Sequence, residues 1–217
     1  MLESEQKRKA SLVYKTLIVL AAVVGILLQC EIGTSNFSLY SFRMFTTLSN
    51  LAVALFFAVY VVFSLRNSSF SDSQKKAFKA FKFLITMCIM LTGLVAHFML
   101  VGMFDSMDAE ANAGLVLLHY VVPIATVLDW LIFDIKGETT RKMPLFAAVF
   151  PVLYALVTMI AAQFMQGDGK YPYPFLNVDI LGVDGVALNI VLLAVAFIAV
   201  GYAGVWVDHK LAAQRGR

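Results

Sequence analysis

Charged residues are scarce in this 217-residue chain: Asp, Glu, Lys and Arg make up 14% of it, against 60% hydrophobic residues, and the mean hydropathy is +0.81. Soluble domains carry about 25% charged and about 45–50% apolar residues, so this composition excludes an ordinary soluble domain. A linker rich in Pro, Gly or Ser, a low-complexity tract and an internal repeat are also lacking, which argues against an attached soluble domain. We therefore predict one membrane domain, residues 1–217.

Cysteine is equally scarce. Cys30 and Cys88 are the two cysteines, and they are predicted at different membrane depths, so a disulfide is not expected. The formal net charge is only +3, and the positions of its lysines and arginines follow the membrane topology, so nucleic-acid binding is not expected. The His, Cys, Asp and Glu residues show no recognised metal-ligand spacing, and we expect no metal and no cofactor.

Long apolar runs are what the sequence has in abundance. Six segments reach the roughly 20 helical residues that a bilayer core requires: residues 11–31, 44–65, 79–103, 113–133, 143–165 and 186–207. Of the 17 lysines and arginines, all but Arg43 and Lys170 fall on one side of these spans, and the positive-inside rule makes that side cytoplasmic. The predicted fold class is an all-α, integral membrane six-transmembrane-helix bundle with both termini cytoplasmic. The predicted location is the plasma membrane, as in a bacterial inner membrane.

Polar side chains from three of the spans are predicted at one depth near the outer face. The second span enters from outside, and its first two turns carry Thr46, Thr47, Ser49 and Asn50. His97 lies about six residues, or roughly 9 Å, from the outer end of the third span, and His119 lies about as deep in the fourth. Thr46, Ser49 and Asn50 share one helical face, whereas Thr47 is turned about 100° away.

This layer allows two interpretations. Ionisable groups inside spans are candidates for function, so Thr46 is our first choice and Thr47 our second for a reacting hydroxyl that gives its proton to His119. Pro123 removes a backbone hydrogen bond near His119 and is expected to kink the helix and open a cavity there. The alternative is that the hydroxyls and His97 serve helix packing. Ser49, Asn50 or an amide freed near Pro123 are unranked candidates for binding an oxyanion.

An acidic residue in the fourth span does not belong to this layer. Asp129 lies ten residues beyond His119, roughly 15 Å along a helix, so it cannot orient the imidazole. Lys82, just inside the third span, reaches a similar depth. We therefore expect an ion pair between Lys82 and Asp129 near the inner boundary.

The longest outer connection, residues 167–185, contains the sequence KYPYPFLN. Its prolines are expected to keep it out of a helix. Its apolar side chains favour a segment that folds back over the outer ends of the bundle and brings Asn177 near the hydroxyl and histidine layer; a simple interfacial turn is the alternative. The supporting residues predicted for the site are therefore Ser49, Asn50, His97, Pro123, Tyr173, Pro174, Phe175 and Asn177.

Three motifs, FTTLSN, HYVVPIATVLD and YPYPFLNV, occur in the order found in a known family. The chain resembles the androgen-induced (AIG-type) multi-pass membrane hydrolases of animals and the bacterial six-span proteins sometimes called Pr-six-Pr. The animal members are threonine-dependent hydrolases of fatty-acid esters of hydroxy fatty acids. The resemblance implies Thr46 as nucleophile and His119 as its partner. Three features depart from the animal pattern: two adjacent threonines, Asp129 in place of Glu, and Pro123 one residue closer to the His.

The resulting hypothesis is an intramembrane threonine hydrolase that cleaves a lipid ester at the outer-leaflet side. Its expected partner is a lipid or fatty-acyl ester substrate within the membrane, and the sequence leaves the oligomeric state open. The alternatives are a non-catalytic lipid-binding protein or a small-molecule transporter. The transporter requires a polar path to the inner side, and inner segments such as LFFAVYVVF offer very little polarity.

Overall fold

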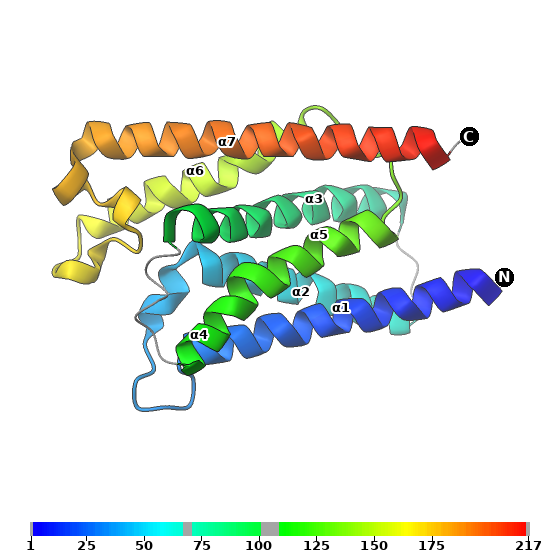
Figure 1. Cartoon of the computed structure of the whole chain (residues 1–217), viewed down its shortest axis with the longest axis horizontal. Coiled ribbons are helices and arrows are strands. Elements are labelled where there is room, and N and C mark those ends of the chain that lie inside the picture. The colour runs from blue at the N-terminus through cyan, green and yellow to red at the C-terminus, as the bar shows by residue number, and fades with distance from the viewer. Residues whose placement is uncertain (1, 67–70, 101–108, 216–217) are drawn as a thin grey trace. The chain divides into compact units, whose positions relative to one another are not determined.

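The computed structural model describes residues 2–66, 71–100 and 109–215, and this part of the chain is helical with no strand. The chain forms two compact units, residues 1–134 and residues 135–217 (Figure 1). The all-α fold class predicted from the sequence is confirmed for these residues. The single membrane domain stays a prediction.

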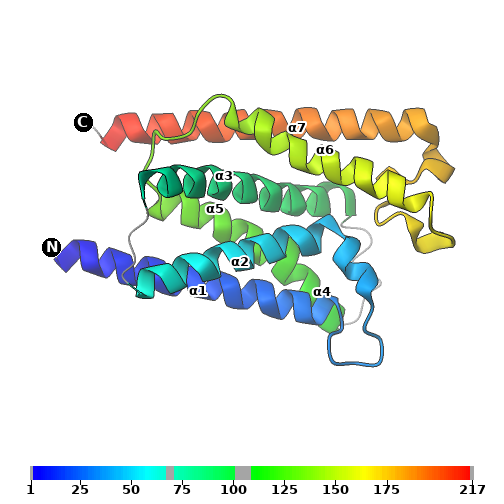
Figure 2. The same ribbon diagram turned by 180° about the vertical axis from the view of Figure 1, so that it is seen from behind.

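The first unit contains the first four spans. Its elements are α1 (Leu2–Gln29), η1 (Leu39–Arg43), α2 (Phe45–Leu65), α3 (Asp72–Val95), η2 (Ala96–Leu100), α4 (Ala109–Val116), η4 (Leu117–Val121) and α5 (Val122–Phe133). The helix α1 packs against α2, α4 and α5, and α3 packs against α2 and α5 (Figures 1 and 2). Both η2 and η4 are π-helical turns that continue their neighbours, so the third and fourth spans are each built from more than one helical segment.

The second unit consists of α6 (Met143–Ala162), η5 (Asp168–Lys170), η6 (Pro174–Leu176) and α7 (Val178–Arg215). The two long helices pack against each other (Figure 2). The helix α7 is interrupted at Gly182, whose φ of 69° lies in the left-handed region that glycine adopts without a Cβ clash. At the other end of the unit, the buried Asp208 carboxylate accepts hydrogen bonds from Gly137 N, Thr139 N and Thr139 Oγ1.

Six helical segments are long and apolar enough to cross a membrane: Glu5–Gln29, Phe45–Leu65, Ser73–Met99, Asn112–Phe133, Met143–Ala162 and Val178–Gln214. They identify the chain as a multi-pass membrane protein and confirm six candidate spans. The predicted bounds differ at several ends, since α1 starts well before residue 11 and α6 ends at Ala162. Residues 101–103, the predicted end of the third span, lie outside the described residues.

The last helix begins at Val178 instead of the predicted residue 186. Prolines therefore keep the connection out of an α-helix only as far as Asn177. The Asn177 side chain caps the helix, because its Oδ1 accepts hydrogen bonds from Asp179 N at 3.0 Å and Ile180 N at 3.3 Å. The cap thus begins a short helical segment, and the backbone is interrupted at Gly182 before the long helix continues.

An apolar core lies between two polar regions of the first unit. Its buried members are Ile18, Ala22, Val53, Ala54, Phe56, Phe57, Ile85, Ile89 and Val122. On α2 the core residues follow Asn50, and on α3 they follow Lys82 and precede Thr92. In the fourth span, Val122 lies between His119 and Asp129. The core therefore separates a region around His119 from a region around Asp129.

Candidate functional site

The structure places Thr46 and His119 in direct contact. Thr46 lies in the first turn of α2 and His119 in η4, each is 4% exposed, and Thr46 Oγ1 is 3.1 Å from His119 Nε2. On the other side of the ring, His119 Nδ1 is 3.0 Å from the Leu115 carbonyl oxygen. A carbonyl can only accept, so Nδ1 carries a proton and, in the neutral ring, Nε2 accepts the Thr46 hydroxyl proton. A hydroxyl, a base and a group that orients the base are thus in line.

Pro123 shapes the backbone beside this pair. The Val122 N–H bonds to the Leu117 carbonyl, five residues back, as in a π-helix. The next such bond would run from residue 123 to the Leu118 carbonyl, and it cannot form because proline has no N–H. Instead, Asn50 Nδ2 donates to Leu118 O at 3.1 Å. The kink predicted at Pro123 therefore takes the form of a π turn with one carbonyl bound by α2.

The side chains of the two adjacent threonines point in different directions. Thr47 is fully buried, and its Oγ1 has no hydrogen-bond partner within the described parts of the chain. It lies on the side of Cys30, whose thiol is also buried. A thiol buried in apolar surroundings is a poor nucleophile. This divergence favours Thr46 over both Thr47 and Cys30 as the partner of His119.

Ser49 and Asn50 hold the Thr46 backbone in place. The Thr46 carbonyl accepts from Ser49 Oγ at 3.0 Å and from Asn50 Nδ2 at 2.9 Å. Ser49 Oγ also lies 2.8 Å from Thr92 Oγ1, which is 3.3 Å from the Cys88 carbonyl. Two hydroxyl hydrogens therefore serve three contacts, and both Asn50 amide hydrogens are used. In this arrangement neither Ser49 nor Asn50 has a spare hydrogen to donate to an oxyanion. Thr92, which contacts Ser49, was not predicted from the sequence.

His97 lies apart from the Thr46 and His119 pair. It belongs to η2, its side chain is exposed, and its ring meets the rings of Phe98 and Tyr120 edge-on, with centroids 4.9 and 6.2 Å away. Among the described residues no hydrogen bond joins His97 to Thr46 or His119. The structure thus brings one of the two predicted histidines to the hydroxyl layer.

The four supporting residues of the Tyr-Pro segment belong to the second unit. Tyr173 is buried and stacks on Phe175, with centroids 5.1 Å apart, and it also meets Tyr154. Pro174 begins η6. The Phe175 carbonyl accepts from Asn189 Nδ2 at 3.0 Å, and Asn177 caps α7. Each side chain has a defined role within its own unit, and their place beside the hydroxyl layer stays a prediction.

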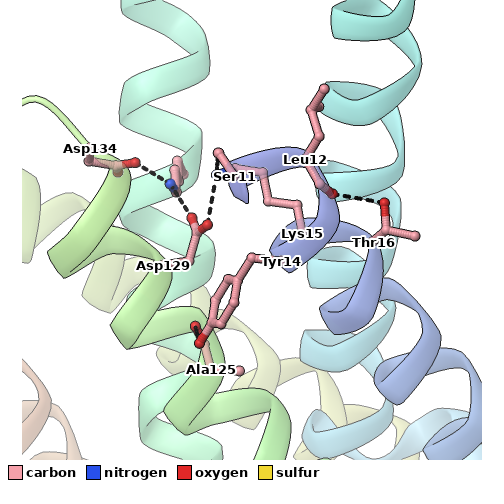
Figure 3. Close-up of polar contacts among 9 residues, drawn as sticks. Ser11, Leu12, Tyr14, Lys15, Thr16, Ala125, Asp129 and Asp134 are labelled. Carbon is pink, nitrogen blue, oxygen red and sulfur yellow. Dashed lines mark hydrogen bonds and ion pairs between the residues drawn. The ribbon is translucent and has the colours of Figure 1, made fainter. Parts of the chain in front are cut away.

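A second polar cluster contains Asp129, Lys82, Lys15 and Asp134. Figure 3 labels Lys15, Asp129 and Asp134 of this cluster. The predicted ion pair is confirmed, with Lys82 Nζ 2.6 Å from Asp129 Oδ2, and Lys82 also pairs with Asp134. Lys15 Nζ lies 2.6 Å from Asp129 Oδ1 and 2.7 Å from Ser11 Oγ. The two ammonium groups and two carboxylates balance in charge and tie α1 and α3 to the end of α5.

Sequence reasoning counted Lys15 only among the lysines and arginines of the cytoplasmic side and missed its part in this cluster. The available signal was its setting, LVYKTLIVL, because a lysine within an apolar run requires a partner. Aromatic rings complete its surroundings: Lys15 Nζ is 4.9 Å from the Phe133 ring centroid and 5.0 Å from that of Tyr60. Lys15 is 2% exposed and Asp129 is fully buried.

Across the described ranges, no group of three or more His, Cys, Asp and Glu side chains is placed to hold a metal ion. Thr46 and His119 themselves offer a hydroxyl and an imidazole. No family model, curated protein or solved structure matches this chain.

Proposed function

We propose that this protein is an intramembrane hydrolase of lipid esters, with Thr46 as nucleophile and His119 as general base. The observation that carries the proposal is the hydrogen bond between Thr46 Oγ1 and His119 Nε2, with Nδ1 of the same ring bound to a backbone carbonyl. That carbonyl fixes both the tautomer and the ring orientation, which is the task of the carboxylate in a catalytic triad. Asp129 has no such task, because it is bound to Lys15 and Lys82.

This geometry supports acylation of Thr46 as the first step. His119 Nε2 takes the hydroxyl proton as Thr46 Oγ1 attacks the ester carbonyl carbon. The tetrahedral intermediate collapses when the bond to the alcohol oxygen breaks, and His119 returns its proton to that oxygen. Thr46 is at the second position of α2, whose N-cap residue Met44 provides no side-chain cap. The positive end of the helix dipole thus favours the negative charge that develops beside Thr46.

The substrate class is a fatty-acid ester that reaches the site from the lipid phase. Both reacting side chains are almost fully buried within membrane-spanning helices. An acyl chain partitions into this apolar region, whereas a water-soluble substrate does not. The loop lysines and arginines support cytoplasmic termini, and this topology puts the Thr46 and His119 layer in the outer leaflet. We extend the proposal to a plasma-membrane location, as in a bacterial inner membrane.

Two neighbouring threonines provide a matched test. Detergent-purified wild type, Thr46→Val and Thr47→Val would be incubated with a p-nitrophenyl ester of a medium-chain fatty acid and, separately, with an alkyl fluorophosphonate. We expect turnover and a covalent adduct in wild type and Thr47→Val, and neither in Thr46→Val. His119→Gln should lose about 10²–10⁴-fold in rate, the contribution typical of a general base.

The proposal fails if wild type shows neither turnover nor adduct with a panel of lipid esters, which would favour a non-catalytic lipid-binding protein. It also fails if Thr46→Val stays as active as Thr47→Val. Melting temperatures in detergent establish that each variant is folded. We expect folded protein from Thr46→Val and Thr47→Val, because each keeps the shape of the side chain and removes one hydroxyl.

A further inference from the structure

The Asn50 side chain is fixed with one end bound and the other end unpartnered. Its Nδ2 lies 2.9 Å from the Thr46 carbonyl oxygen and 3.1 Å from the Leu118 carbonyl oxygen. Carbonyl oxygens only accept, so the atom between them must be the amide nitrogen, and the amide cannot be flipped. Both amide hydrogens are used in these two bonds.

The orientation of the nitrogen determines that of the oxygen. Asn50 is fully buried, and its Oδ1 has no hydrogen-bond partner in the described part of the protein. An unpaired buried acceptor costs stability, and an apolar side chain at this position would avoid that cost. The Asn50 amide is held by its nitrogen, so its Oδ1 can accept a hydrogen bond from an O–H or N–H group of another molecule.

The Asn50 side chain is linked to the reacting pair through the backbone. Asn50 lies four residues after Thr46, on the same face of α2. Its nitrogen holds the carbonyl of Thr46 itself and the carbonyl of Leu118, which precedes His119. Thr46, His119 and Asn50 are thereby joined in one hydrogen-bonded group, and Oδ1 is the one atom of the Asn50 amide left to bind another molecule.

We infer that Asn50 Oδ1 binds the hydroxyl group that receives the acyl chain, an inference that rests on the proposed function. After acylation the carbonyl carbon is bonded to Thr46 Oγ1, and release requires an O–H group within a region that excludes bulk water. Water is the acceptor for hydrolysis, and an alcohol is the acceptor for acyl transfer. Both present the O–H donor that Oδ1 lacks.

The bound oxygen attacks the carbonyl carbon of the acyl-threonine, and its proton passes to His119 Nε2. The tetrahedral intermediate then breaks the bond to Thr46 Oγ1, which takes the proton back from His119. A water acceptor leaves as the carboxylic acid and an alcohol acceptor leaves as a new ester, with Thr46 and His119 restored.

The test separates acylation from deacylation. With a p-nitrophenyl ester, Asn50→Leu should keep a burst of about one p-nitrophenol per protein, lose at least about tenfold in the steady-state rate, and accumulate an acyl adduct on Thr46 by intact mass. Asn50→Asp, which in its protonated form keeps an acceptor oxygen and one donor, should recover part of that rate. Thr126→Val, which removes a buried hydroxyl bonded within α5, is the control and should behave as wild type.

Each outcome identifies what has failed. A steady-state rate for Asn50→Leu equal to wild type overturns the inference and leaves the proposed function intact. Equal loss of the burst and the steady state in folded Asn50→Leu also overturns it, because Asn50 would then only position Thr46. If Asn50→Leu does not fold, Asn50→Ala, which also removes Oδ1, decides: an unchanged burst with a slowed steady state supports the inference, and an unchanged steady state overturns it. A wild type with neither burst nor adduct contradicts the proposed function itself, and the inference falls with it.

The two sources of the hydroxyl are separated by adding ethanol to the wild-type reaction. Free fatty acid as the sole product assigns the bound hydroxyl to water, and ethyl ester formation assigns it to an alcohol as well. In either case the inference requires Asn50→Leu to slow that product. An ethyl ester rate that is unaffected by Asn50→Leu overturns it.

Discussion

Two polar clusters lie within the first unit on opposite sides of its apolar core, and they are built differently. The cluster of Lys15, Lys82, Asp129 and Asp134 is charged and balanced, and both Asp129 oxygens are bound. The cluster of Thr46, Asn50 and His119 consists of neutral groups and leaves Asn50 Oδ1 without a partner among the described residues. The first has its bonds complete, and the second keeps capacity for another molecule.

The difference separates stability from reactivity. A saturated ionic cluster within a membrane bundle fixes helix positions, because removal of one member leaves a buried charge unpaired. An unsaturated neutral cluster contributes less to stability and can exchange partners during a reaction. The charged cluster should therefore govern whether the unit folds, and the neutral cluster should govern whether it turns over a substrate.

The largest expected effect on stability is that of Asp129→Leu. This change leaves the Lys15 ammonium without its carboxylate and removes one of two carboxylates from Lys82. We expect a loss of about 3–5 kcal/mol, as is typical when a buried ion pair loses one partner, measured as unfolding in mixed detergent and SDS. Thr46→Val, in contrast, should abolish turnover with a much smaller change in stability.

A double variant tests whether the charged cluster acts as one ionic unit. Lys15→Met combined with Asp129→Leu removes one charge of each sign and leaves Lys82 paired with Asp134. The double variant should be more stable than Asp129→Leu alone, a positive coupling that a double-mutant cycle measures. Additive losses would contradict the assignment of the cluster as one ionic unit.

The helix contact behind His119 predicts an intermediate effect. A Cβ at Gly93 would lie 3.0 Å from the His119 carbonyl oxygen and 3.2 Å from Pro123 Cβ. Gly93→Ala should therefore push η4 away from α3, at a cost of about 1–3 kcal/mol, and lower turnover by moving the His119 ring. Gly204→Ala is the matched control, since nothing lies within 4 Å of its Cβ. Turnover unchanged in Gly93→Ala would show that the ring position tolerates this shift.

Sequence reasoning succeeded where one physical rule dominates. Apolar length alone predicts six spans, and the loop charges predict that Thr46 and His119 share a depth. It also predicted the Lys82 and Asp129 pair from the same depth argument. Helical periodicity predicted that Thr47 points away from Thr46, and the structure places Thr47 on the side of Cys30. These results depend on hydropathy, charge and the helical repeat, each of which can be counted along the chain.

The features that were missed depend on contacts between helices. Pro123 predicts an irregular turn near His119, but no local pattern specifies that Asn50 of another helix takes the Leu118 carbonyl. The orientation of His119 by the Leu115 carbonyl is likewise a product of that turn. The early start of α7 depends on the Asn177 cap, which hydropathy does not report. Local sequence thus predicts depth and face, and packing between helices determines hydrogen-bond partners.

The smallest expected effect comes from an ion pair in the second unit. Lys170 Nζ lies 2.5 Å from Asp179 Oδ2, and the Asp179 side chain is 55% exposed. The hydrogen bond to Asp179 raises the pKa of Lys170 above its ordinary value of 10.5. A raised lysine pKa means that any stability from the pair is present below 10.5 and is lost as the pH rises through the raised value. Solvent and salt screen such a pair, so Lys170→Gln should leave the melting temperature at pH 7 unchanged within error. We attribute the stabilising effect of the Asp129 cluster to its burial. A decrease in melting temperature for Lys170→Gln as large as that for Asp129→Leu would contradict this, because it would show that an exposed ion pair stabilises as much as a buried one.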